Sequence, residues 1–253
     1  MTNYQLQIKS FVFGPFETNC YVVSDEQQIL LVDPACSNES ERQQLVRYIE
    51  NLSPSTFHLS PFTFHLSIIA THGHLDHLWG AAWVCAKWNT PVLMHEADIP
   101  MAKAMQQQYD LFGIRAKAQP FPIEDIKSKI INHKFEISNF QLLETPGHTP
   151  GSVCLYFPKS PITNHQSPIP NYQSPILFSG DTLFHMGYGR TDLPGGNYSQ
   201  FMNSLDLLLA LPPETVVYPG HGEHTTIGAE ARWIVRERGM EEVNANRNIE
   251  GRS

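Results

Sequence analysis

Apolar and polar positions follow a strand-like pattern at the start of the chain and a helical pattern soon after. Strand-like runs are predicted at residues 4–14, 19–25 and 28–35. An amphipathic helix is predicted next over residues 37–52, whose helically spaced apolar positions are Leu45, Ile49 and Leu52. Asn38 and Glu41 stand at its start in the spacing of a capping box.

The same alternation continues to the end of the chain. Further strands are predicted at residues 66–70, 91–95, 176–181 and 215–222, with a β-rich region at 134–157. Further helices are predicted after residue 77, with Trp79, Ala82, Trp83 and Ala86 on one face, and at 101–112, 198–211 and 225–239. Strand groups that alternate with single helices favour two packed sheets with helices outside. No linker divides residues 1–240, so we expect a single domain.

Two repeated segments interrupt this pattern. The motif TFHLS occurs at residues 56 and 63, and SPI occurs at residues 160, 167 and 174. Neither segment has a core-forming period, and long surface insertions cost little free energy. We therefore predict loop insertions at 53–67 and 159–175. The ending IEGRS resembles a factor Xa cleavage site, so residues 241–253 are read as a tail that need not be entirely native.

The composition excludes several classes of protein. Hydrophobic residues make up 41% of the 253 residues and charged residues 17%, which suits a folded chain with a core. A net charge of -8 without a basic run disfavours a nucleic-acid partner. No signal peptide or membrane span is recognised, and the four cysteines form no CxxC pair. We expect a cytoplasmic protein with reduced thiols and no membrane partner, and the oligomeric state stays open.

A cluster of metal-ligand residues stands out in the stretch IIATHGHLDHLWGAAW at 68–83. Residues two apart in an extended chain point the same way, so His72 and His74 can share one metal ion. Asp76 and His77 lie where a helix begins and can face a second ion. Imidazole and carboxylate are ligands that zinc and similar divalent ions prefer.

The missing ligands are supplied further along the chain, each beside glycine at the end of a predicted strand. They are His148 in ETPGHTPG, Asp181 in LFSGDTLF and His221 in VYPGHGEH. Strand ends converge on one edge of a sheet, so ligands distant in sequence can meet there. The remaining histidines, at 58, 65, 95, 133, 165, 185 and 224, have no such context and are expected to be structural or surface residues.

The order H-x-H-x-D-H, then His, Asp and His, resembles the metallo-β-lactamase superfamily over nearly the whole chain. The resemblance implies an α/β fold, the four-layer αββα sandwich. It also implies one ion held by His72, His74 and His148, a second held by Asp76, His77 and His221, and Asp181 as the bridge. Asp33, in LVDPA, matches a family position near the site, where the residue supports the metal ligands without binding the metal itself.

Two divalent ions, zinc above all but also iron or manganese, would suit this ligand set. A water between them would lose a proton near neutral pH, because metal binding lowers its pKa from about 15.7 to about 7. The resulting bridging hydroxide can attack a carbonyl, with Asp76 orienting it. The sequence therefore predicts a metal-dependent hydrolase in which Asp76 and Asp181 take part in catalysis.

The segment GDTLFHMGYGRTDLPGG resembles the glyoxalase II-like, or hydroxyacylglutathione hydrolase-like, branch of the family. The resemblance implies a thioester hydrolase whose small-molecule substrate is a glutathione thioester, with Arg190 and Tyr188 as substrate contacts. Asp192 stands where glyoxalase II has a tyrosine contact, and few residues follow His221 compared with the helical C-terminal domain of those enzymes. The match is therefore to the short, single-domain members, and weak glutathione binding is expected.

Two alternatives stay open at this point. Short persulfide dioxygenases share the fold, the HxHxDH run and a similar GRTD segment, and use one iron held by the equivalents of His72, His148 and Asp181. A noncatalytic metal-binding protein is the third reading, although nothing in the sequence removes a ligand. Metal content separates the hydrolase from the dioxygenase, because hydrolysis is expected with about two zinc ions per chain and oxidation with one iron.

Overall fold

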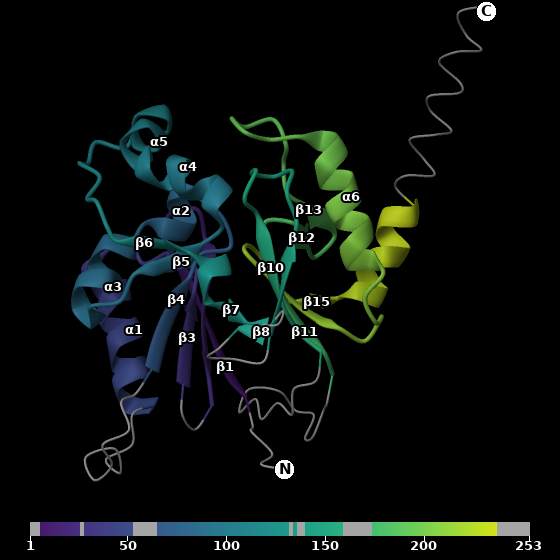
Figure 1. Cartoon of the computed structure of the whole chain (residues 1–253), viewed down its shortest axis with the longest axis horizontal. Coiled ribbons are helices and arrows are strands. Elements are labelled where there is room, and N and C mark those ends of the chain that lie inside the picture. The colour runs from purple at the N-terminus through teal and green to yellow at the C-terminus, as the bar shows by residue number, and fades with distance from the viewer. Residues whose placement is uncertain are drawn as a thin grey trace, which may run out of the picture.

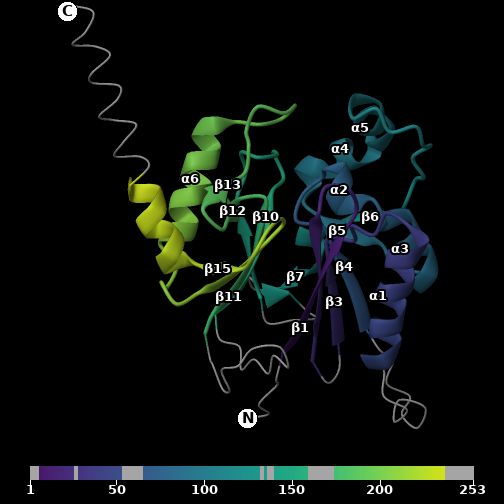
Figure 2. The same cartoon turned by 180° about the vertical axis from the view of Figure 1, so that it is seen from behind.

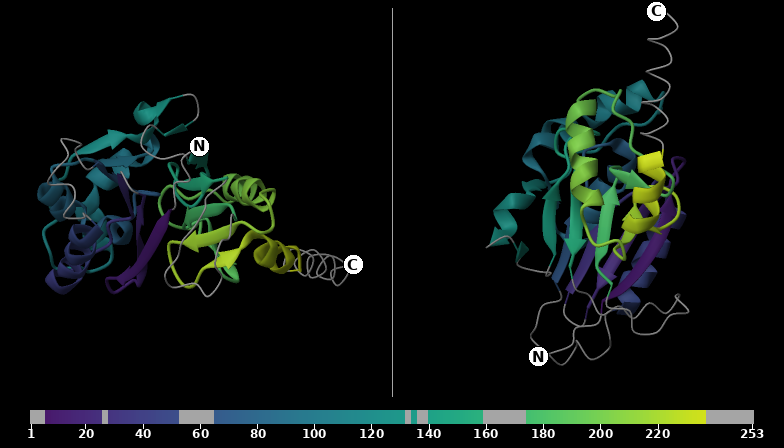
Figure 3. Two further views of the ribbon diagram at one scale, coloured as in Figure 1. Left: turned by 90° about the horizontal axis from the view of Figure 1, so that it is seen from below. Right: turned by 90° about the vertical axis from the view of Figure 1, so that its right-hand side faces the viewer.

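The computed structural model describes residues 6–25, 28–52, 65–131, 134–135, 140–158 and 174–236. Two β-sheets pack face to face and helices cover the outer face of each (Figure 1). Seen from below, the two groups of helices lie on opposite sides of the paired sheets (Figure 3). The predicted αββα sandwich is thus confirmed. No helix in this described part of the chain is long and apolar enough to cross a membrane.

The first sheet has the strand order β1-β2-β3-β4-β5-β6, and β1 forms its outer edge (Figure 2). The strands are β1 (Gln7–Phe13), β2 (Thr18–Ser24), β3 (Gln28–Val32), β4 (His65–Ile69), β5 (Val92–Met94) and β6 (Ile123–Asp125). The first three strands pair antiparallel, whereas β3 to β6 run parallel. Its helices are α1 (Glu39–Leu52), α2 (Leu75–Leu78), α3 (Ala81–Trp88), α4 (Ile99–Lys103) and α5 (Met105–Leu111).

The second sheet has the order β15-β14-β11-β10-β9. Its strands are β9 (Gln141–Glu144), β10 (Val153–Phe157), β11 (Ile176–Gly180), β14 (Val216–Pro219) and β15 (Thr225–Thr226). Here β11 and β14 are the parallel pair. Helix α6 (Tyr198–Leu209) and the helix at 227–236 cover its outer face. Short elements complete the described fold: β12 (Leu183–Phe184), β13 (Gly187–Tyr188), β7 (Ile130–Ile131), β8 (Lys134–Phe135), and the 3₁₀ turns η2 (Glu96–Asp98) and η3 (Ile126–Lys129).

Alternating side chains of the strands divide the core into layers. On β2, Tyr21 and Val23 face the other sheet, whereas Cys20 and Val22 face the helices. On β11, Phe178 lies between the sheets and Leu177 packs under α6. The strands are apolar on both faces because both faces are covered, which explains their nearly continuous hydrophobic runs. All four cysteines are buried free thiols, as expected.

Helix α1 begins as the sequence predicts, with a difference in its capping box. Asn38 accepts the backbone N–H of Glu41 at 3.1 Å, which is the predicted N-cap. The Glu41 carboxylate does not return to Asn38 but accepts the backbone N–H of Ser37 at 2.6 Å and that of Gly14 at 3.1 Å. The helix start is thereby tied to the β1–β2 turn.

The helix predicted after residue 77 is instead two short helices, α2 and α3, which meet at Gly80. A Cβ at Gly80 would lie 2.3 Å from Sγ of Cys36 and 2.8 Å from the carbonyl oxygens of Pro34 and Cys36. The chain must pass so close to the β3–α1 loop that only glycine fits. The buried side of these helices carries Leu78, Ala81, Val84 and Cys85, whereas Ala86 on the predicted face is exposed.

The structure corrects the C-terminal boundary of each predicted insertion. The first was placed at 53–67, but β4 begins at His65, and Ser67 is buried within the sheet. The second was placed at 159–175, but Ser174 is buried, and the carbonyl of Pro175 accepts the backbone N–H of Val216 at 2.9 Å. Parallel pairing to the neighbouring strand fixes both ends. The rest of both segments, at 53–64 and 159–173, and the tail at 241–253 lie outside the described residues.

The close contact at Gly80 is open to a direct test. Gly80→Ala should destabilise the protein by about 1–3 kcal/mol, because the added methyl overlaps backbone atoms that cannot move freely. Gly187→Ala is the matched control, since its Cβ would meet no atom nearer than 3.9 Å. Urea denaturation of both variants checks the prediction, and equal stability of the two would contradict it.

Candidate metal centre

The carboxyl ends of the parallel strands bring the predicted ligands together. Loops leave β4, β11 and β14 at the same edge of the paired sheets and carry His72, Asp181 and His221. His148 comes from the β9–β10 turn, and α2 carries Asp76 and His77. Within the described residues, the seven predicted ligands form overlapping groups whose ligand atoms lie within 4.8 Å of one another.

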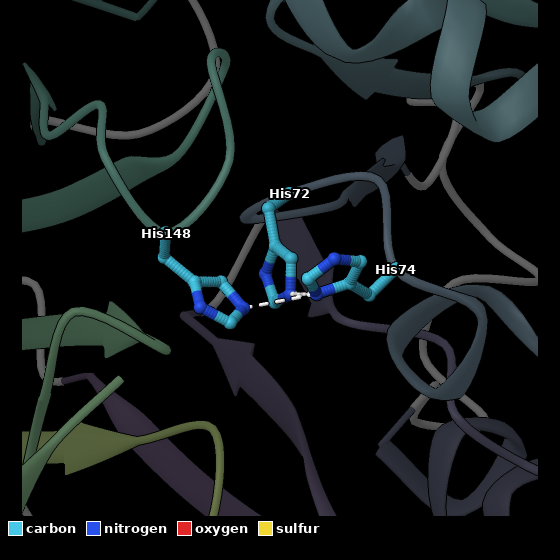
Figure 4. Close-up of side chains that lie close together, drawn as sticks. All are labelled: His72, His74 and His148. Carbon is cyan, nitrogen blue, oxygen red and sulfur yellow. Dashed lines mark hydrogen bonds between the residues drawn. The ribbon is translucent and has the colours of Figure 1, made fainter. Parts of the chain in front are cut away.

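Three imidazole nitrogens converge in the first triad, formed by His72, His74 and His148 (Figure 4). Nδ1 of His74 lies 3.1 Å from Nε2 of His72 and 2.9 Å from Nε2 of His148. Nδ1 of His72 faces the Thr71 hydroxyl at 3.1 Å, and Nδ1 of His148 faces the Arg190 carbonyl at 2.7 Å. These partners make both Nδ1 atoms donors, so both Nε2 atoms present lone pairs.

This geometry suits a cation. If Nδ1 of His74 is unprotonated, both contacts set lone pairs against each other, and if it is protonated, its single hydrogen can point to only one of the two Nε2 atoms. Burial, with His148 beside it, lowers the pKa of His74 to about 4, and burial also lowers the pKa of His72 well below its usual range. Neutral imidazoles with converging lone pairs are the form in which histidine binds metal ions.

The second triad consists of Asp76, His77 and His221. Oδ2 of Asp76 lies 3.4 Å from Nε2 of His77 and 3.2 Å from Nε2 of His221. Nδ1 of His77 donates to Asp33 at 2.9 Å, and Nδ1 of His221 donates to the Phe16 carbonyl at 3.0 Å. A carboxylate or carbonyl that accepts a hydrogen bond from one ring nitrogen of a histidine fixes the tautomer and the ring orientation, so the other nitrogen can bind a metal ion.

Asp181 lies between the two triads. Its Oδ2 is 3.5 Å from Nε2 of His148 and 3.6 Å from Nε2 of His221, and its Oδ1 is 3.2 Å from Nε2 of His77. Nε2 of His77 and Oδ1 of Asp181 are buried without a hydrogen-bond partner. Buried polar atoms are rarely left so, and here a bound ion is the partner that would satisfy them. The carboxylate therefore lies within reach of ligand nitrogens of both triads, and its role as a bridge between two ions stays a prediction.

Negative charge dominates the second triad. Burial opposes protonation of His77, but the carboxylates of Asp76, Asp181 and Asp33 outweigh it and raise the pKa of His77 well above its usual range. Burial likewise disfavours both charged carboxylates, yet His77 lowers the pKa of Asp76 and that of Asp181. The three carboxylates therefore favour a positive charge at this point of the site.

Asp33, predicted to support the ligands, does so from the end of β3. Its carboxylate accepts the backbone N–H of Thr71 at 2.7 Å, the hydroxyl of Thr71 at 2.9 Å and Nδ1 of His77. It is buried and adopts a positive φ of 54°. One side chain therefore braces ligands of both triads, through Thr71 and through His77.

Two supporting residues escaped the sequence analysis. Asp98 is buried and accepts the backbone N–H of Gly73 at 2.8 Å, the Thr149 hydroxyl at 2.6 Å and the backbone N–H of Gly151 at 2.6 Å. It thus joins the His72–His74 loop to the His148 loop.

Gln108 on α5 binds the backbone of the same His72–His74 loop. Its Oε1 accepts the N–H of Leu75 at 2.9 Å, and its Nε2 donates to the carbonyl of Gly73 at 3.0 Å. No local motif marks either residue, because each acts on backbone atoms far away in the sequence.

A pocket of about 390 Å³ opens above the ligands. Its walls include ligands from both triads and the predicted substrate contacts Tyr188 and Arg190. Its other lining residues are Phe16, Leu75, Phe112, Phe184, Gly189 and Leu193. The volume lies within the range of small-molecule sites.

Arg190 and Tyr188 differ in how they are held at this pocket. The Arg190 guanidinium is exposed and donates to both carboxylate oxygens of Asp192, each at 2.6 Å. Tyr188 is half-buried, and its ring lies against Phe201 and Trp233.

The histidines not predicted as ligands stay outside the cluster wherever their side chains are described. His95 caps η2 through its Nδ1, which accepts the backbone N–H of Ala97. His185 lies 3.4 Å from Glu230, and His224 stacks on Tyr218. Their surroundings are structural, in agreement with the sequence reading.

Comparison with known proteins agrees with this geometry. The family model described as the metallo-beta-lactamase superfamily matches residues 13–162 and 173–221. This chain belongs to the metallo-β-lactamase superfamily. Membership supports the coarse conclusions of the sequence analysis, namely a metal-binding protein of a hydrolase superfamily whose sites are dinuclear.

Individual superfamily relatives are similar along most of the chain. A "Probable metallo-hydrolase YqgX" of Bacillus subtilis is 31% identical, over 86% of this chain and 90% of its own. "Hydroxyacylglutathione hydrolase GloC" of Haemophilus influenzae is 29% identical, over 86% of this chain and 91% of its own. The solved structure "TTHA1623 in a di-iron-bound form" is 31% identical with a TM-score of 0.66, over 88% of this chain and 97% of that one.

The two triads predict the metal content. We expect two divalent ions per chain, roughly 3.5 Å apart, since that is the usual spacing of paired hydrolytic ions. Elemental analysis of the purified protein gives the stoichiometry, and a crystal structure gives the spacing. A fully loaded structure in which Asp76 and His77 contact no ion would contradict the assignment.

Gly220 should be essential for metal retention. A Cβ there would lie 2.2 Å from Oδ1 of Asp181 and 2.7 Å from Cε1 of His77. Gly220→Ala should therefore displace the bridging carboxylate and lower metal affinity by about 10-fold or more, as disturbed ligand supports do. Competition with a chelator measures the change. The control Gly187→Ala adds the same methyl at ordinary van der Waals distance, with no atom nearer than 3.9 Å, and should keep wild-type affinity.

Proposed function

We propose that this protein is a metal-dependent thioester hydrolase of the glyoxalase II type, with a small-molecule substrate. The observation that carries the proposal is the position of Asp181, whose carboxylate oxygens lie between two ligand triads on the floor of an open pocket. Hydrolysis adds water across the carbon–sulfur bond, so the acyl carbon gains the hydroxyl group and the thiol leaves with the proton. Two bound divalent ions, zinc in our proposal, would lower the pKa of a water and polarise the substrate carbonyl.

The chain itself positions the reacting groups. Asp76 is fixed by the Thr18 hydroxyl, which donates to its Oδ2 at 2.9 Å, so the carboxylate is held in place to orient a water bound beside it. Asp181 holds the two halves of the site at a set distance. A thiolate is a good leaving group, so no strong general acid is needed, and the pocket lining supplies none besides the ligands.

The similarity to the hydroxyacylglutathione hydrolase of Haemophilus influenzae supports the choice of thioester chemistry. Tyr188 and Arg190 line the pocket and are the proposed substrate contacts. The buried, unpaired cysteines support a reducing compartment such as the cytoplasm. A one-iron persulfide dioxygenase needs only His72, His148 and Asp181, whereas here Asp76, His77 and His221 also form a complete group.

Turnover of S-D-lactoylglutathione by the zinc-loaded protein tests the proposal. Thiol release should be measurable, and Asp181→Ala should reduce it by about 1,000-fold or more, because the bridge between the ions is lost. Asp110→Ala is the control, since this exposed aspartate bonds only to Gln106 on the same helix. Oxygen uptake on glutathione persulfide by an iron-loaded protein that hydrolyses no thioester would favour the dioxygenase instead.

A further inference from the structure

The walls of the pocket are unusually apolar for a site that would bind a charged peptide thiol. Apart from the metal ligands, the lining consists of apolar or aromatic side chains, one glycine and one charged residue, Arg190. Phe16 and Phe112 stand at its mouth with 36% and 45% of their surface exposed. Large exposed aromatic side chains beside a pocket indicate a surface that a ligand covers.

These aromatic rings form a connected wall. Phe16 and Phe112 meet edge to face, with centroids 5.4 Å apart, and Phe16 also lies 6.1 Å from Trp79. Phe184 lies across the pocket floor, edge-on to His221 at 6.0 Å. Because Phe16 is fixed by these contacts and its carbonyl is bonded to His221, the wall keeps a set position over the ligands.

The positive charge at the mouth is already neutralised. Both the Nε and Nη2 groups of Arg190 donate to Asp192, which is the paired geometry that a substrate carboxylate would use. The hydrogen bonds from Arg190 lower the pKa of Asp192 to about 2, so the aspartate is ionised at working pH. A carboxylate on the substrate must either displace Asp192 or use the remaining N–H groups of the guanidinium, and in both cases it stays beside the negative charge of Asp192.

We infer that this site selects thioesters whose group next to the scissile carbonyl is apolar and about the size of an aromatic ring, and that Asp192 acts against glutathione thioesters by occupying Arg190. The inference rests on the proposed function and specifies its substrate class. Phe16, Phe112 and Phe184 would hold the apolar group. Asp192 would be a specificity-determining residue although it lies outside the pocket lining itself.

Paired substrates test the apolar wall without changing the leaving group. The zinc-loaded protein is given S-phenylacetyl- and S-acetyl-N-acetylcysteamine, which share a neutral thiol. We expect kcat/KM to be about tenfold higher for the phenylacetyl compound, and Phe112→Ala to remove most of this preference. Leu111→Ala is the matched control, because Leu111 adjoins Phe112, is 65% exposed and does not line the pocket. Equal kcat/KM for the two thioesters would overturn the inference.

A double-mutant cycle tests the role of Asp192 on S-D-lactoylglutathione. Asp192→Asn should lower KM about threefold, because it frees the guanidinium for a substrate carboxylate. Arg190→Ala should raise KM in the wild-type background, but by less than it does in Asp192→Asn, where it should also cancel the gain. An unchanged KM in Asp192→Asn, or a gain that persists without Arg190, would overturn the assignment of Asp192.

Binding measurements separate this inference from the proposed function. Titration calorimetry of the zinc-loaded protein with phenylacetate and with D-lactate needs no turnover, and we expect phenylacetate to bind about tenfold more tightly in the wild type but not in Phe112→Ala. If no thioester is hydrolysed but this difference appears, the proposed function fails and the apolar site stands. If thioesters are hydrolysed but the difference is absent, the function stands and the inference fails.

Discussion

Electrostatic crowding is the constraint on which the rest of this structure depends. Imidazole lone pairs and carboxylates point into one small, mostly buried volume, where like groups repel each other and water is scarce. The fold tolerates this because bound cations would offset the repulsion and because neighbouring groups hold each ligand in place. Asp33 shows the arrangement best, since it braces His77 directly and the His72 loop through Thr71. Four of the ligand rings, those of His72, His77, His148 and His221, are held in this way by groups that are not ligands.

The same crowding links metal ligation to substrate recognition. The carbonyl of Phe16 orients His221, and the carbonyl of Arg190 orients His148, while the side chains of both residues line the pocket. Backbone atoms therefore orient the metal ligands, whereas the side chains face the pocket. The side chains on these loops can be substituted without loss of the backbone carbonyls that hold the ligands. This division explains physically how one metal site can accept different substrates.

Loop-to-loop contacts set the geometry within each half of the site. Asp98 ties the His72–His74 loop to the His148 loop, and Gln108 holds the first loop to α5. Close glycine contacts do the same for the second half, since Gly220 leaves only enough room for Asp181 and His77. Because the backbone is closely packed at these contacts, a small displacement of one loop also moves the ligands next to it.

The sequence alone determined the layers of the fold and the ligand set. Strand and helix periodicity depends on which faces are buried, and the ligands carry their chemistry in side-chain type and spacing, so both can be read locally. The break at Gly80 and the supports Asp98 and Gln108 were decided by tertiary structure. Each depends on atoms from separate segments meeting within a few ångströms, and such a meeting leaves no periodic or motif signal in either segment.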